Sequence, residues 1–172
     1  MSTQELLAAV NSPRLREFIS VWAGLRRDRR MPAWSDVRPA QFKGVLSIIW
    51  AWTYDAAAED FVGRIAGEQI NAVFGMNIRG QTMSKVYSGH DYVHMLARHR
   101  RVMSEPALFG GTGLVFRHLD RFDVGERVIL PLGNDGANGD TILGATDFKS
   151  DFGSPPEALL SGGETEAWFA LD

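Results

Sequence analysis

The amino-terminal part of the chain carries apolar residues at the spacing of an amphipathic helix. Ser12 and Pro13 favour a helix start, because serine caps a helix and proline suits its first position. The apolar side chains that then recur on one face are Leu15, Phe18, Ile19, Trp22 and Leu25. This stripe must pack either on a sheet or on a second copy of the helix. In the second case, Trp22→Asp would disrupt self-association and leave the core folded.

Residues 45–54 show the period of two that is typical of a strand. Large side chains occupy alternate positions of this segment, namely Leu46, Ile48, Trp50, Trp52 and Tyr54. Residues 60–66 (DFVGRIA) predict a second strand. The link between the two segments is short, which predicts that they pair antiparallel.

The middle of the chain is predicted to be mainly helical. Residues 67–80 form a short helical stretch interrupted by glycine, 81–89 are irregular, and a firmer helix covers 90–104. The apolar stripe of this helix consists of Tyr92, Leu96, His99 and Met103. The opposite face is predicted to hold His94, Arg98, Arg101 and Glu105.

Three strands are predicted in the remaining part. The glycines of residues 110–113 indicate a turn, and residues 114–119 follow as a strand. Residues 128–132 and 141–148 then form a β-hairpin around a loop rich in Gly, Asn and Asp. Pro131 has no N–H to donate, so its nitrogen is expected to face away from a partner strand or to lie where the strand ends. This order of elements predicts an α+β fold with an antiparallel sheet.

Composition narrows the classes of function. The chain has 172 residues, a formal net charge of −3 and no cysteine. The negative charge argues against nucleic acid as a partner, and the lack of cysteine excludes thiolate metal sites and flavin chemistry that forms a thiol adduct. No apolar stretch approaches the ~20 residues of a membrane span, and the first residues do not resemble a secretory signal. We therefore expect a cytoplasmic protein without membrane contact.

Several short motifs occur in an order that resembles a PAS domain. They are residues 64–67 (RIAG), 74–75 (FG), 78–80 (IRG), the helix across 92–103, 130–132 (LPL) and 135–136 (DG). The preceding amphipathic helix, with a connector containing residues 30–32 (RMP) and 36–39 (DVRP), is similar to that of small stand-alone bacterial PAS proteins. The resemblance covers roughly residues 13 to 150.

This resemblance implies a five-stranded antiparallel sheet whose helices enclose a small cavity over one face. The expected parts are an N-terminal helix and connector (1–44), a PAS core (45–150) and a flexible C-terminal tail (151–172). The candidate cavity residues are Trp50, Trp52, Tyr92, Leu96, His99 and Met103. All of them are also plausible core residues, since aromatic side chains at strand spacing usually serve packing.

The function implied by the resemblance is a non-catalytic sensory or signalling module. Such a module would bind a regulatory protein, self-associate as a homodimer, and be gated by a small ligand in its cavity. The candidate interaction residues are Phe18, Trp22 and Trp168. Trp168 lies in the predicted tail, where it would either dock back on the domain or bind a partner.

Two alternatives rest on particular residues. Haem-binding PAS domains place their iron ligand on the helix that carries His99, so haem is one candidate cofactor, while a structural core histidine is the plainer interpretation. His90 and His94 have the spacing of a metal pair, but both lie on the polar side without a third ligand. A small-molecule enzyme on an α+β fold is the second alternative, although no set of acid and base residues converges in the sequence.

Overall fold

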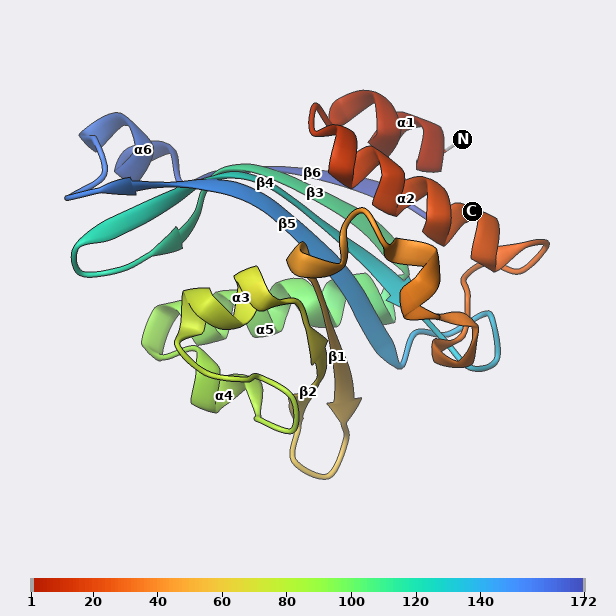
Figure 1. The fold of residues 1–172 in the computed structure, drawn as a ribbon. Helices are drawn as coiled ribbons and strands as arrows, with labels where there is room; N and C mark the ends of the chain where they lie inside the picture. Colours follow the sequence, from red (N-terminus) through yellow and green to blue (C-terminus); the bar gives the residue numbers. More distant parts are fainter. Residues whose placement is uncertain (1, 172) are drawn as a thin grey trace.

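A single curved antiparallel sheet separates two layers of helices (Figure 1). The computed structural model describes residues 2–171. The strands are β1 (Ile49–Asp55), β2 (Asp60–Ala66), β3 (Ala107–Arg117), β4 (Arg121–Leu132), β5 (Thr141–Phe152) and β6 (Glu164–Ala170). Their order across the sheet is β2-β1-β5-β4-β3-β6. The predicted α+β class and antiparallel sheet are confirmed, and the predicted five strands are joined by a sixth.

The helices lie on both faces of this sheet. Helices α1 (Ser2–Ala9) and α2 (Pro13–Arg26) cover the upper face in Figure 1, and α3 (Glu68–Phe74), α4 (Met83–Val86) and α5 (Gly89–Ser104) lie under the other. Helix α6 (Glu157–Gly162) sits at the far end of the long strands. Three short 3₁₀ turns are η1 (Trp34–Asp36), η2 (Pro39–Phe42) and η3 (Leu46–Ile48). Within residues 2–171, no helix is long and apolar enough to cross a membrane.

Helix α2 begins as predicted and packs its apolar stripe on the sheet. The backbone N–H of Leu15 donates to Ser12 Oγ at 3.2 Å, and Pro13 occupies the first turn. Phe18 and Trp22 are fully buried. The indole N–H of Trp22 donates to the Pro131 carbonyl at 3.0 Å. The prediction that Phe18 and Trp22 form an interaction surface is therefore corrected, because this face is occupied by the chain's own sheet.

Strand β1 divides its side chains between two separate cores. Ile49 and Ala51 join the core under α1 and α2, whereas Trp50 and Trp52 join the core above α3 to α5. The predicted alternation is thus present from Ile49 onward. It does not extend to residues 46–48, which form η3 instead of strand. The 3₁₀ turn rotates Ile48 into the same core as Ile49, so the period of two does not hold there.

The glycine-rich residues 110–113 lie inside β3 and do not form the predicted turn. They pair with β4 on one side and with β6 on the other. Glycine is needed here for space, because a Cβ at Gly110 would lie 3.1 Å from Leu6 Cδ1 and one at Gly111 would overlap the Glu164 carboxylate. The glycines thus allow close approach to both faces of the strand.

The segment predicted as a flexible tail contains β6. Its residues pair with β3 from Ala107↔Ala170 to Gly113↔Glu164, so seven residue pairs extend the sheet. Trp168 docks edge-on against Phe109, with 4.9 Å between ring centroids, and Leu171 is buried. The tail interpretation is therefore corrected. The segment is short and follows two glycines, which is why a strand was not predicted there.

A glycine under the Trp50 indole leads to a stability prediction. A Cβ at Gly144 would overlap the buried Trp50 ring, so Gly144→Ala should displace the indole and lower the free energy of unfolding by about 1–3 kcal/mol. Gly24 is the matched control, because it is exposed in α2 and a methyl group added there would have no heavy atom within 4 Å. Gly24→Ala should raise stability by about 0.5–1 kcal/mol. Urea denaturation of both variants checks the opposite signs.

Candidate functional site

Helix α5 presents a buried stripe to the sheet that differs from the predicted one. Its buried residues are Met95, Arg98, His99 and Val102. Tyr92, Leu96 and Met103 are only partly buried at the margin of the same core. Arg98, predicted on the opposite solvent-facing side, has a side chain that is only 2% exposed. The helix is rotated relative to the prediction because β6 supplies carboxylates that receive this arginine.

His99 is a core residue enclosed by aromatic rings. Its ring stacks on Trp50, with 5.3 Å between centroids, and meets the edge of Phe61 at 5.7 Å. Among the described residues, neither ring nitrogen of His99 has a hydrogen-bond partner. Burial, reinforced by the neighbouring guanidinium groups of Arg98 and Arg127, holds the pKa of His99 well below 6.5.

The lowered pKa of His99 predicts a specific pH dependence of stability. In the unfolded chain His99 takes up a proton near pH 6.5, whereas in the folded chain it stays neutral to a lower pH. The contribution of neutral His99 to stability is therefore complete above pH 6.5 and is lost as the pH falls below that value. From pH 7.5 to 5.5, wild type should lose more stability than His99→Leu, which lacks the group, with a difference on the order of 1 kcal/mol. Urea denaturation at both pH values measures this difference. An identical pH dependence in the two proteins would contradict it.

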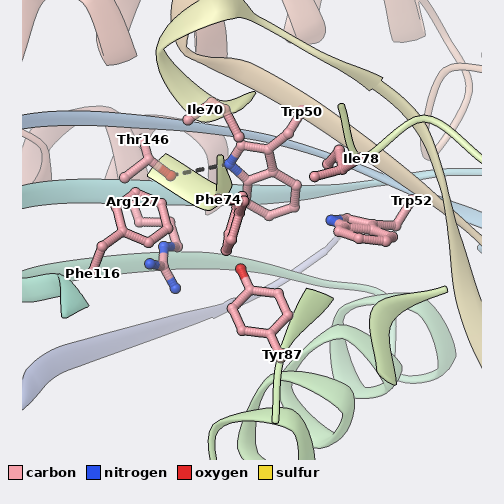
Figure 2. Close-up of a pocket in the computed structure, with 9 residues that line it drawn as sticks. All are labelled: Trp50, Trp52, Ile70, Phe74, Ile78, Tyr87, Phe116, Arg127 and Thr146. Carbon is pink, nitrogen blue, oxygen red and sulfur yellow. Dashed lines mark hydrogen bonds between the residues drawn. The ribbon is translucent and has the colours of Figure 1, made fainter. Parts of the chain in front are cut away.

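Between the sheet and α3 to α5 lies a cavity of about 10 Å³ (Figure 2). Two predicted cavity residues, Trp50 and Trp52, line it, whereas Tyr92, Leu96, His99 and Met103 do not. The Trp50 indole N–H donates to Thr146 Oγ1 at 3.0 Å. The remaining lining residues are Ile70, Phe74, Ile78, Tyr87, Phe116, Arg127 and Thr146. Such a volume corresponds to about one water molecule, so the interior is largely filled by side chains.

The surroundings of His99 do not match those of a haem ligand. A macrocycle bound to His99 would need a space beside the imidazole, but that ring is fully buried between Trp50 and Phe61. The adjoining cavity of about 10 Å³ is far too small and is not lined by His99. The residues present therefore do not fit haem.

A larger groove of about 790 Å³ opens next to the small cavity. It runs between α3 to α5 on one side and β3, β4 and the start of β6 on the other. The groove adjoins the cavity, since both spaces are lined by Phe74, Tyr87, Phe116 and Arg127. Burial raises the pKa of Tyr87, which keeps its hydroxyl protonated at neutral pH. In size the groove lies within the range of small-molecule sites, and its wall is more polar than that of most such sites.

Two buried arginines lie in the wall of the groove, among other polar residues. Arg98 donates to Glu164 Oε2 at 2.8 Å and to Glu166 Oε1 at 2.6 Å. Arg127 donates to the Val115 carbonyl at 2.5 Å and lies 3.6 Å from Glu164 Oε2. Within the described chain, the Nε atoms of both arginines and Oε1 of Glu164 lack hydrogen-bond partners. These atoms are buried as well as unpaired, so a molecule in the groove would reach them only after the surrounding side chains move.

The carboxylate of Glu166 is held in its charged form by this arrangement. Partial burial favours protonation, but the hydrogen bonds from Arg98 and from the Trp168 indole outweigh it and lower the pKa of Glu166. His94 also lies in the groove wall, with Nε2 3.4 Å from Glu166 Oε1. The positive charge on this side of the groove thus comes from α5 and the negative charge from β6.

The two histidines of α5 that were considered above as a metal pair are exposed side chains one turn apart. The rings of His90 and His94 lie 6.3 Å apart and nearly parallel, and His94 Nε2 contacts Arg98 at 2.8 Å. Within residues 2–171, no group of three or more His, Cys, Asp or Glu residues is arranged to hold a metal ion. Both histidines instead belong to the wall of the groove.

Sequence reasoning missed the cluster of Arg98, Arg127, Glu164 and Glu166, which are four of the six Asp, Glu and Arg residues that line the groove. The alternation of Glu164, Glu166 and Trp168 is the period of two that indicates a strand, and it was the available signal for β6. Arg127 directly precedes the predicted strand at 128–132, and no position was predicted for it from the sequence. The contacts themselves depend on which strand pairs with β3, and that is not visible in the sequence.

Most of the chain is similar to a known protein family. A family model described as a PAS domain matches residues 10–147. This region contains α2, all elements from η1 to β4 and the first half of β5, and it ends before β6. The searches of curated proteins and of solved structures gave no match.

Proposed function

The chain belongs to the PAS domain family, and on this premise we propose that it is a sensory and signalling module whose ligand site is the groove beside α5. PAS domains are typically non-catalytic, and we propose that this one also acts through binding alone. The observation that carries the proposal is the 790 Å³ groove, whose buried Arg98 and Arg127 carry donors without partners in the described chain. We further propose a cytoplasmic location and a regulatory protein as its partner.

The lining of the groove indicates the kind of ligand. Phe74, Tyr87 and Phe116 provide flat apolar contact, while Arg127 and Glu164 provide one donor and one acceptor that the described residues leave unpaired. A small molecule with a planar apolar part and both donor and acceptor groups would suit this lining, and it would pair with these buried atoms if the side chains around them moved. The nearly filled interior makes the groove a better candidate than the cavity of Figure 2.

A route by which binding could change the surface runs through β6. Glu164 and Glu166 pair with Arg98 in the groove, and the other face of β6 contacts α1. Beyond β6, Arg30 donates to the Leu171 carbonyl at 2.9 Å. A ligand that competes for Arg98 would loosen β6, and this would alter the contacts of the N-terminal helices.

Native mass spectrometry of the freshly purified protein tests the ligand site. We expect a retained small-molecule mass in wild type, and its loss in Ser161→Trp, which places a bulky ring at the exposed rim of the groove. Ala58→Trp in the exposed β1–β2 turn is the matched control and should keep the mass. Two outcomes contradict the proposal: a mass retained equally by both variants, or no retained mass together with no thermal shift across a small-molecule library.

A further inference from the structure

Strand β6 is an addition to the sheet of the family core. The family model ends at residue 147, and the five strands before β6 already form a sheet with β3 at its edge. An uncovered β3 would present a row of free N–H and C=O groups, which is a template for another strand. The seven residue pairs between β3 and β6 satisfy this edge. The core domain thus has an edge that requires an extended segment.

The core recognises particular side chains of the strand that occupies this edge. Glu164, Glu166 and Trp168 alternate and therefore share the face of β6 that meets α5. Arg98 binds both carboxylates, at 2.8 and 2.6 Å. The Arg101 guanidinium lies 4.0 Å from the centre of the Trp168 ring. Two acidic residues at alternate positions and an aromatic residue two positions further on are therefore recognised together.

The buried position of Arg98 makes these contacts selective. Its side chain is 2% exposed, and its two carboxylate partners in the described chain both come from β6. A strand without acidic residues at these positions would leave the guanidinium buried and unpaired, which is strongly unfavourable. The charge of the site thus selects for acidic segments.

The connection to β6 is exposed and makes few buried contacts. Helix α6 buries none of its residues, and Gly153 and Gly163 at the ends of the connection have φ values of 89° and 56°. A segment with so few buried contacts opens at lower free energy than the core. The connection itself therefore does little to hold β6 in place, and β6 is held mainly by its own contacts with β3 and α5.

We propose that the β3 edge, with Arg98 and Arg101, is a docking site for an extended acidic and aromatic segment of a partner protein, and that β6 occupies this site intramolecularly. The proposal rests on the proposed signalling function and names the chemistry of its partner. The partner adds a strand to the sheet in place of β6, with backbone hydrogen bonds giving affinity and Arg98 giving specificity. Charge complementarity to Arg98 identifies the occupant as acidic.

The test uses the complete chain with a protease site inserted after Gly153 and cut after folding. The probe is a fluorescently labelled peptide of residues 162–172. We expect anisotropy to show saturable binding to the cut protein, and binding at least about 100-fold weaker to the uncut chain, where the tethered β6 competes at high effective concentration. The peptide with Glu164→Gln and Glu166→Gln should bind at least about 10-fold more weakly, and Thr165→Gln, on the opposite face, should bind like wild type.

A second peptide separates the proposed chemistry from the protein's own sequence. A peptide with Glu164→Asp, Glu166→Asp and Trp168→Phe should compete for the site, and a scrambled peptide should not. If cutting unfolds the protein, the uncut Glu164→Gln/Glu166→Gln chain provides the measurement, because its weakened β6 should admit the wild-type peptide more readily than wild type does.

Three results would overturn the proposal. They are equal binding of the acidic and glutamine peptides, no binding to a folded cut chain, and a concentration-dependent dimer of the uncut chain that excludes peptide, which would assign the edge to a second copy. The retained ligand mass is measured on the uncut chain without peptide. Failure of peptide binding therefore leaves the ligand-site proposal standing, and loss of the ligand site leaves the peptide result interpretable.

Discussion

Trp22→Asp is expected to unfold the protein. Trp22 is fully buried between α2 and the sheet, and its indole N–H donates to the Pro131 carbonyl. Truncating a buried tryptophan alone removes about 3–5 kcal/mol, and the new carboxylate would be buried without a partner. Since a domain is typically stable by only about 5–15 kcal/mol, we expect loss of the cooperative unfolding transition in circular dichroism.

Ser20→Asp is the matched control for this prediction. Ser20 lies on the exposed face of the same helix, so the same charge is added in water, and stability should change by less than about 0.5 kcal/mol. A folded Trp22→Asp protein with altered self-association would instead support the dimer contact that the helix pattern left open. The two outcomes separate a helix that covers the sheet from one that covers a second copy.

Arg98→Met is the second substitution with a large expected effect. It leaves Glu164, whose side chain is 9% exposed, with Arg127 at 3.6 Å as its remaining cationic neighbour. Breaking a buried ion pair from one side is strongly destabilising, and we expect a loss of about 3 kcal/mol. Urea denaturation measures this loss. Hydrogen exchange should show faster exchange of the β6 amides, because β6 loses its two ion pairs with Arg98 on α5.

Two comparisons make the Arg98 result specific. Arg101→Met removes an exposed pair with Glu105 and the stacking on Trp168, and should lose no more than about 1 kcal/mol. Arg98→Met combined with Glu164→Gln should lose less than Arg98→Met alone, since no buried charge is then left unpaired. Equal losses for Arg98→Met and Arg101→Met would contradict the buried ion-pair interpretation.

The sequence predicted those elements whose signals are local. The cap at Ser12 and the stripe of α2, the β1–β2 pair and the hairpin of β4 and β5 are all visible in short stretches, and the structure contains each of them. These elements depend on capping, periodicity and turn residues, which act over a few positions. The fold class followed from their order.

The predictions that were wrong concern contacts between distant segments. The 3₁₀ turn over residues 46–48 replaces strand, and residues 110–113 became strand because β6 and β4 both pair with them. Arg98 was placed toward solvent because its partner Glu164 is 66 residues away. A charged side chain is buried only where a partner of opposite charge lies beside it, and that partner is known only when the strand order is known.

The sharing of one sheet by two cores has a consequence for how the protein melts. Neighbouring residues of the same strands, such as Phe109 with Leu108 and Ile129 with Leu130, belong to opposite cores. Loss of either helical layer would expose one face of the sheet to water, and the other face of the same strands packs against the remaining layer. The two layers should consequently come apart together, so heating should give one cooperative transition for both.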